Sequence, residues 1–194
     1  LTVNVNSLNQ VVGGQLLASN SFVGAGGNWS NNGLLASEGT LSINLEGTYS
    51  ASGRLSSLGS LDLRAAQLHF SETATLAGGD GTRVTVAGQL NNAGRMTSAT
   101  DLNLIANEVS NTGTLGAGAN LMLTADTALN RDGLIFSGGD MQLLTTTFTN
   151  AYATVYGLGN VLIAKDTDHN QADLLDNRSG TVESAQNLSI RAMT

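Results

Sequence analysis

The densest group of side chains that could do chemistry lies between Lys165 and Arg178, in one polar stretch of the sequence. It places four of the 15 acidic residues beside one of the two histidines. Carboxylates and imidazole are ligands of divalent metals, so a metal site is one interpretation. The other, which we favour, is a solvated excursion without a metal that offers a contact surface. The candidate interaction residues are Asp166, Asp168, His169, Asp173 and Asp176.

A second candidate metal site is the run Gly-Gly-Asp-Gly at residues 78–81. It resembles one unit of the calcium-binding nonapeptide of bacterial toxins, but that motif builds a site only when it repeats every nine residues on stacked turns. The run occurs once in this sequence. We therefore expect a widened corner of the chain here, and we expect no metal or cofactor in the protein.

Catalytic motifs are missing: there is no G-x-S-x-G, no H-E-x-x-H and no Walker loop. His69 and His169 stand too far apart in the repeat described below to share a site. Polysaccharide-degrading enzymes need two acids within roughly 5 to 10 Å of each other. Four acids of the predicted strands and corners fall instead at different phases of the repeat: Asp62, Asp101, Asp126 and Asp140. Tyr152 and Tyr156 are the main surface aromatics. We expect no enzyme, with a polysaccharide-degrading β-helix as an open alternative.

Composition excludes several other classes of protein. The 15 acidic and 8 basic residues give a net charge of −7, and the basic residues are scattered, so no nucleic-acid partner is expected. No apolar run approaches the ~20 residues of a membrane span, so no membrane insertion is expected. The absence of Cys excludes a disulfide scaffold and a zinc ribbon. The 24 Gly and the absence of Pro remain to be explained.

The elements that would position these residues follow a repeat of about 20 residues. Alternating apolar pairs mark short strands with one buried face, and dipeptides such as Asn32-Gly33 and Thr112-Gly113 mark bends at the same step. Each unit supplies three short strands and three corners, and no segment sustains a helical period. The pairs are Leu41/Ile43, Leu61/Leu63, Val84/Val86, Leu102/Leu104, Leu121/Leu123, Met141/Leu143, Val161/Ile163 and Leu188/Ile190.

Two architectures accept such units, the leucine-rich repeat and the parallel β-helix. The L-x-x-L-x-L spacing of the leucine-rich repeat does not recur, so we predict an all-β, right-handed parallel β-helix of about nine coils. Equivalent strands of successive coils would pair about 4.8 Å apart and give a rod roughly 40 Å long. Proline would remove a ladder hydrogen bond from each coil, which explains its absence.

The same repeat predicts columns of inward side chains. One column should hold Trp29, Tyr49, Leu68, Leu90, Val109, Leu129 and Phe148, and another Leu34, Leu55, Leu76, Met96, Leu115, Leu134 and Val155. Asparagines recur at one corner, at Asn31, Asn91, Asn111 and Asn150. They have two interpretations: turn formers, which we favour, or a hydrogen-bonded ladder along the stack.

We divide the chain into residues 1–27, an irregular first coil or coils; 28–165, regular coils; and 166–194, a final coil stretched by the polar excursion. The three parts should form one continuous domain. Because Leu1 is not an initiator methionine, we expect a piece of a longer protein.

Three repeats and the tail carry a family likeness. The segments LNNAGRMTSATDLNLIA, VSNTGTLGAGANLMLTA and LNRDGLIFSGGDMQLLT resemble the haemagglutinin repeats of filamentous haemagglutinin and of contact-dependent growth inhibition toxins. The likeness covers residues 28–164. The tail VLIAKDTDHNQADLLDNRSGTVESAQNLSIRA is similar to a long-loop coil beyond the regular repeats of the inhibition-toxin proteins.

The resemblance implies a large exoprotein of Gram-negative bacteria, exported by two-partner secretion through an outer-membrane transporter and presented at the cell surface. It implies that these repeats form a non-enzymatic stalk that holds an adhesive or toxic element toward neighbouring cells. The first alternative is a binding module in which the loop from Asp166 to Asp176, or an outer face, recognises a target-cell surface receptor.

Overall fold

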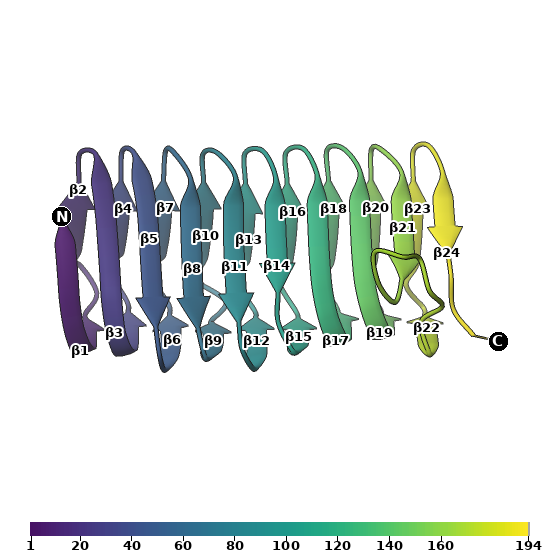
Figure 1. The fold of residues 1–194 in the computed structure, drawn as a ribbon, viewed down its shortest axis with the longest axis horizontal. Helices are drawn as coiled ribbons and strands as arrows, with labels where there is room; N and C mark the ends of the chain where they lie inside the picture. Colours follow the sequence, from purple (N-terminus) through teal and green to yellow (C-terminus); the bar gives the residue numbers. More distant parts are fainter. Residues whose placement is uncertain (194) are drawn as a thin grey trace.

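The computed structural model describes residues 1–193, and this part of the chain folds into strands and turns without a helix. The chain winds along one axis, so that each coil crosses two sheets before the next coil begins (Figure 1). In the described residues the strands pair in parallel, as a β-helix requires. The predicted all-β solenoid is therefore confirmed.

One sheet has nine strands, with one from each coil. Its strands are β2 (Gln15–Ala18), β4 (Leu34–Ser37), β7 (Arg54–Ser57), β10 (Thr75–Gly78), β13 (Arg95–Ser98), β16 (Thr114–Ala117), β18 (Leu134–Ser137), β20 (Thr154–Gly157) and β23 (Thr181–Ser184). The predicted number of about nine coils is close to this count. The right-handed sense of the coil stays a prediction of the crossover rule.

The other sheet has 15 strands, because most coils cross it as two short legs separated by a bend. In β1, β3, β17 and β19 the two legs are continuous. The strands are β1 (Thr2–Gln10), β3 (Ser21–Asn31), β5 (Thr40–Leu45), β6 (Thr48–Ala51), β8 (Leu61–Ala65), β9 (Gln67–Phe70), β11 (Thr82–Val86), β12 (Gln89–Asn92), β14 (Leu102–Ile105), β15 (Glu108–Asn111), β17 (Leu121–Arg131), β19 (Met141–Ala151), β21 (Val161–Ala164), β22 (Leu174–Arg178) and β24 (Leu188–Ile190).

The register reproduces the period of the sequence. Leu35 pairs with Leu55 and Met96 with Leu115, steps close to 20 residues, whereas Val155 pairs with Val182 because the last coil carries the excursion. Inward aliphatic side chains of successive coils stack into one continuous apolar interior. Trp29 and Tyr49 are fully buried in it, as predicted.

Three residues of the predicted columns face outward. Ala128 replaces Leu129 in the column, because two consecutive outward residues at the bend between the legs of β17 shift the alternation by one. Leu35 and Ile135 are buried in place of Leu34 and Leu134. At each of these two sites two adjacent residues are aliphatic, so the apolar pattern does not show which of them faces inward. A shift of one residue exchanges the two faces of a strand.

The first coil is better ordered than predicted. β1 pairs with β3 along both of its legs, from Thr2 with Val23 to Gln10 with Asn31. Gly24 is part of β3, and the ring of Trp29 lies against it, which leaves no space for a Cβ atom. The glycine-rich segment is thus shaped by the packing of Trp29, and residues 1–27 form a paired coil.

The widened corner was predicted at the wrong place. Residues 79–81 separate β10 from β11, and the neighbouring corners at 58–60 and 99–101 contain the same number of residues. The extra residues of this coil lie instead at 71–74, between β9 and β10, where the coils on either side have a two-residue bend. Asp80 accepts a hydrogen bond at 2.9 Å from the backbone N–H of Gly81, which gives its carboxylate a local role in the turn.

Candidate functional site

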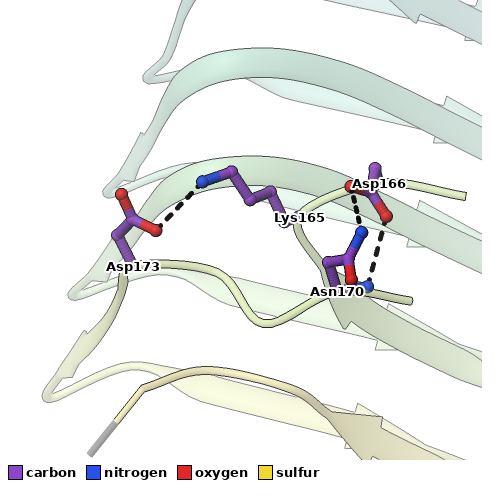
Figure 2. A network of polar contacts seen from close by, with 4 residues as sticks. All are labelled: Lys165, Asp166, Asn170 and Asp173. Atoms are coloured by element: carbon purple, nitrogen blue, oxygen red, sulfur yellow. Dashed lines mark hydrogen bonds and ion pairs between the residues drawn. The ribbon is translucent and has the colours of Figure 1, made fainter. Parts of the chain in front are cut away.

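The polar excursion leaves the stack after β21 and returns to it at β22. Lys165 opens it and Asp173 closes it, and the Lys165 Nζ lies 3.1 Å from an Asp173 carboxylate oxygen. Both side chains are about half-exposed, so this ion pair is weakened by solvent. It nevertheless joins the two ends of the excursion (Figure 2).

Asp166 organises the first half of the excursion (Figure 2). Its carboxylate accepts hydrogen bonds from the side-chain amide of Asn170 at 2.8 Å, from the Asn170 backbone N–H at 3.2 Å and from the Asp168 backbone N–H at 3.0 Å. These bonds favour the ionised form, so they lower the pKa of Asp166, and the Asn170 side chain has the largest effect. His169 closes the turn in the left-handed region at φ 60°.

The excursion packs on the outside of the rod. Ala172 is fully buried, and its backbone N–H donates a hydrogen bond to the Arg191 carbonyl. Leu144 and Ala164 are also buried although they lie outside the interior apolar cluster. In the preceding coils the residues paired with Leu144 along its column, Thr124 and Ile105, are at least partly exposed. The excursion therefore covers a small second apolar cluster on the outer face of β19.

The five candidate interaction residues do not converge. Asp166 and Asp173 are held by the contacts above, while Asp168 and His169 are exposed at the tip. Asp176 lies on β22, next to Thr149 of β19, and forms an ion pair with Arg178 at 2.8 Å. The loop predicted from Asp166 to Asp176 thus ends at Asp173. Within residues 1–193, no three His, Asp or Glu side chains gather closely enough to hold a metal ion.

One polar network is an asparagine ladder in which all members but the last are buried. The side-chain amide of each asparagine donates to the side-chain carbonyl of the asparagine in the next coil, at 2.8 to 2.9 Å. The same amides also donate to corner carbonyls, such as that of Thr154 from Asn130. The members of the ladder are Asn92, Asn111, Asn130, Asn150 and Asn177.

The ladder corrects two predictions about the corner asparagines. Cross-coil bonding, the less favoured interpretation, is what the structure shows, and Asn92 takes the place predicted for Asn91. Asn91 faces outward, where its amide nitrogen lies 3.0 Å from a ring nitrogen of His69. Asn31 lies at the same phase but donates to the Tyr49 hydroxyl, because Ala51 and Phe70 follow it in the column. Burial raises the pKa of Tyr49 well above its usual range.

A second polar ladder runs along an exposed corner. Asn120 donates from its backbone and side chain to one carboxylate oxygen of Asp101, and Asn160 does the same to Asp140. The backbone N–H of Asp140 donates to Asn120. Asp101 and Asp140 are therefore separated by an amide and joined to the stack. The sequence prediction that Asp101 and Asp140 fall at different phases of the repeat is therefore wrong. Each directly precedes the apolar pair of its repeat, so the 20-residue period could have aligned them.

The remaining acids of the enzyme alternative also have structural partners or lie apart. Asp62 forms an exposed ion pair with Arg64 at 3.2 Å, on the outer face of β8. His69 is an exposed strand residue, and Tyr152 is 70% exposed at a corner. In the described part of the chain no helix is long and apolar enough to cross a membrane. In the described residues these side chains thus belong to a ladder, to an exposed ion pair, or to exposed strands and corners.

The comparison with protein families decides what the repeat is. The family model of the haemagglutinin repeat matches residues 1–94, 70–126 and 104–192, which together cover nearly the whole chain. The chain belongs to the haemagglutinin-repeat family. No curated protein and no solved structure matches it. The family model reaches into the first coil and the excursion, so the haemagglutinin repeats extend on both sides of residues 28–164.

Proposed function

We propose that this chain is a stalk segment of a secreted haemagglutinin-repeat exoprotein that presents an adhesive or toxic element at the cell surface. The carrying observation is the continuity of the interior: one apolar cluster and one asparagine ladder run through successive coils without a domain boundary. In a solenoid each coil contacts only its neighbours, so added coils extend the rod without changing its cross-section. Such a segment acts by its length and stiffness.

A pulling experiment tests the mechanical part of this proposal. A chain held at its two ends should resist extension and then yield in steps of one or a few coils, because cross-coil bonds break one coil at a time. The expected step is a multiple of about 20 residues of released chain. A single smooth extension at low force would contradict a role as a stiff spacer.

The second candidate function is receptor binding through the excursion. It is favoured by one observation: Asp168 and His169 are exposed on a loop whose base is fixed by Lys165, Asp173 and the buried Ala172. Such a loop would meet a target-cell receptor without first being ordered. Binding of the labelled chain to candidate target cells separates the two functions. Saturable binding that is lost in the variant Asp168→Ala with His169→Ala would favour the receptor module, and no specific binding would favour the spacer.

Export through an outer-membrane two-partner secretion transporter of a Gram-negative cell is part of the same proposal. The chain has no Cys, which suits passage in an unfolded state because disulfides would obstruct it. Antibodies against this segment should then label intact cells of the source organism, and external protease should remove the label. Detection of the segment only after cell lysis would contradict surface presentation.

A further inference from the structure

The nine-strand sheet runs along the whole rod (Figure 1), and its outer face carries two columns of side chains. Coils of a solenoid stack only on their neighbours, so coils that continue at either end would not cover this face. The third residues of the strands, from β2 to β23, form the first column: Leu17, Ala36, Ser56, Ala77, Thr97, Gly116, Phe136, Tyr156 and Glu183. The first residues of the same strands form the second column: Gln15, Leu34, Arg54, Thr75, Arg95, Thr114, Leu134, Thr154 and Thr181.

The first half of this face contains a groove of about 570 Å³. The small residues Ala36, Ser56 and Ala77 of the first column line it. Leu17 and Leu58 also line it, and they are 55% and 73% exposed. Exposed aliphatic side chains gathered at one groove are typical of a surface that a partner covers.

The second half of the face carries an aromatic ridge, which consists of Leu134, Phe136 and Tyr156. All three side chains are partly exposed. Leu134 and Phe136 lie on the outer side of β18, and Tyr156 follows on β20. The ring of Phe136 leans over Gly116 of the preceding coil, where a Cβ atom would have no space. The ridge therefore extends over three coils, from β16 to β20.

The groove and the ridge lie in different halves of one face. Two copies that meet face to face and antiparallel set the groove of each opposite the ridge of the other, and a two-fold axis relates the two contacts. A parallel pair would set ridge on ridge and leave both grooves empty. Facing sheets lie about 10 Å apart, so side chains of these sizes interdigitate between them. The antiparallel pair is therefore the self-complementary one.

The arginines of the second column agree with one alignment of this pair. Tyr156 comes to lie over Leu17 when the two-fold axis passes between β10 and β13. The same axis sets Arg54 and Arg95 opposite the threonines of β16 and β10. With the axis on β10, Arg54 would face Arg95 of the other copy, and with the axis on β13, Arg95 would face itself. Like charges in contact disfavour an interface, so charge supports the alignment that covers Leu17.

We propose that a second copy of this chain docks antiparallel on the nine-strand sheet, with the two-fold axis between β10 and β13. In this dimer β20 faces β2, so Tyr156 of each copy covers Leu17 of the other. β18 faces β4, and the leaning ring of Phe136 enters the groove at Ala36 and Ser56. The contact joins two rods side by side, beyond the role of a single stalk. Because both copies use the same surface, association stops at the dimer.

A charge pair across the interface tests this alignment. Leu17→Arg and Tyr156→Asp each set a charge against an uncharged side chain of the other copy. Each of these chains alone should therefore dimerise at least about tenfold more weakly than the wild type in sedimentation equilibrium. Mixing the two chains should restore a heterodimer to within about threefold of the wild type. In that heterodimer the introduced opposite charges face each other in one contact, and the other contact keeps Leu17 and Tyr156.

Two further variants control for the position of the charge. Thr97→Arg lies in the same column but does not face Tyr156, so mixing this chain with the Tyr156→Asp chain should restore no dimer. Ile105→Arg, at a site 38% exposed on the other sheet, should leave dimerisation unchanged. Circular dichroism of each chain checks that these outward substitutions keep the fold. A wild type that is monomeric up to about 1 mM would overturn the proposal, as would a dimer that persists in the Tyr156→Asp chain or an equal rescue by Thr97→Arg.

Discussion

Hydrogen bonds in the regular coils join residues far apart in the sequence, whereas those in the excursion at residues 165–173 join residues close together. In the coils, the ladder bonds join residues 19 to 27 positions apart, such as Asn92 with Asn111 and Asn150 with Asn177. In the excursion, Asp166 bonds to Asn170 and Lys165 to Asp173, so the partners are 4 and 8 positions apart. The coils are therefore ordered by repetition and the excursion by its own turn.

This difference determines how far a change should spread. A substitution in a coil disturbs the coils above and below it, because each buried group is satisfied by its neighbours. A substitution in the excursion disturbs only the turn and the small apolar cluster beneath it. We expect large losses of stability from the ladder and small ones from the excursion.

Asn130→Leu should give the largest effect. The change removes the bonds from Asn111 and to Asn150 and Thr154, and it leaves the buried side-chain carbonyl of Asn150 without its donor. An unpaired buried polar group costs about 1–3 kcal/mol and the lost bonds add to this, so the free energy of unfolding should fall by roughly 3–5 kcal/mol. Urea unfolding followed by circular dichroism measures the loss.

Asn91→Leu is the matched control for the ladder. Asn91 is adjacent to the ladder residue Asn92 but faces outward, where water can replace its contacts with His69 and Gln89. Its loss should stay below about 1 kcal/mol. Equal losses in the two variants would show that the ladder adds nothing beyond an ordinary surface contact, and the comparison would fail.

Leu144→Ala tests how the excursion is joined to the rod. Leu144 is 2% exposed beneath it, and its removal should cost about 2 kcal/mol and speed hydrogen exchange at Ala172 and Asp173. Ile105→Ala, in the same column two coils earlier and 38% exposed, should cost less than about 0.5 kcal/mol. Slow exchange in the excursion after Leu144→Ala would mean that its local bonds alone hold it in place.

The sequence predicts the coils because a period of two and a period of about twenty act together. Together the two periods predict the strands, the corners and most of the inward residues, including Trp29 and Leu55. It fails where the local pattern is ambiguous. The pairs Leu34-Leu35 and Leu134-Ile135 fit both faces of a strand, and the bend before Ala128 carries no distinctive residue.

The position of the excursion could be predicted from the sequence, but its contacts could not. The seven extra residues of the last coil interrupt the period, which identifies where the chain leaves the stack. The burial of Ala172 against β19 depends on how the loop folds back, and no repeat describes that. The ladder had a visible signal, since asparagines recur near one corner, but choosing Asn92 over Asn91 requires the strand register.

Tyr152→Asn should stabilise the protein, in contrast to the other coil substitutions. Tyr152 adopts φ 53° at a corner where the equivalent residues of the neighbouring coils are Asp132 and Ser179, also at positive φ. A bulky residue is strained there, whereas asparagine tolerates the left-handed region. The free energy of unfolding should rise by about 1 kcal/mol. Tyr156→Asn on β20, outside this group of positive-φ residues, should give no gain, and a loss in both variants would remove the strain argument.

Asn170→Ala should give the smallest effect and the most local one. The side-chain amide of Asn170 is the largest cause of the lowered pKa of Asp166. In the variant this pKa should therefore rise toward its usual value, and a carboxyl titration by NMR measures the change directly. Because the folded pKa lies below the unfolded value, the hydrogen bonds favour the folded loop above the unfolded pKa. They are lost as pH falls through the folded pKa. The excursion should therefore loosen in acid before the coils do.

Gln171→Ala, next to Asn170, should leave the titration of Asp166 unchanged. If acid instead loosens the ladder coils and the excursion together, the two regions are coupled, and the distinction between order by repetition and order by a local turn does not hold.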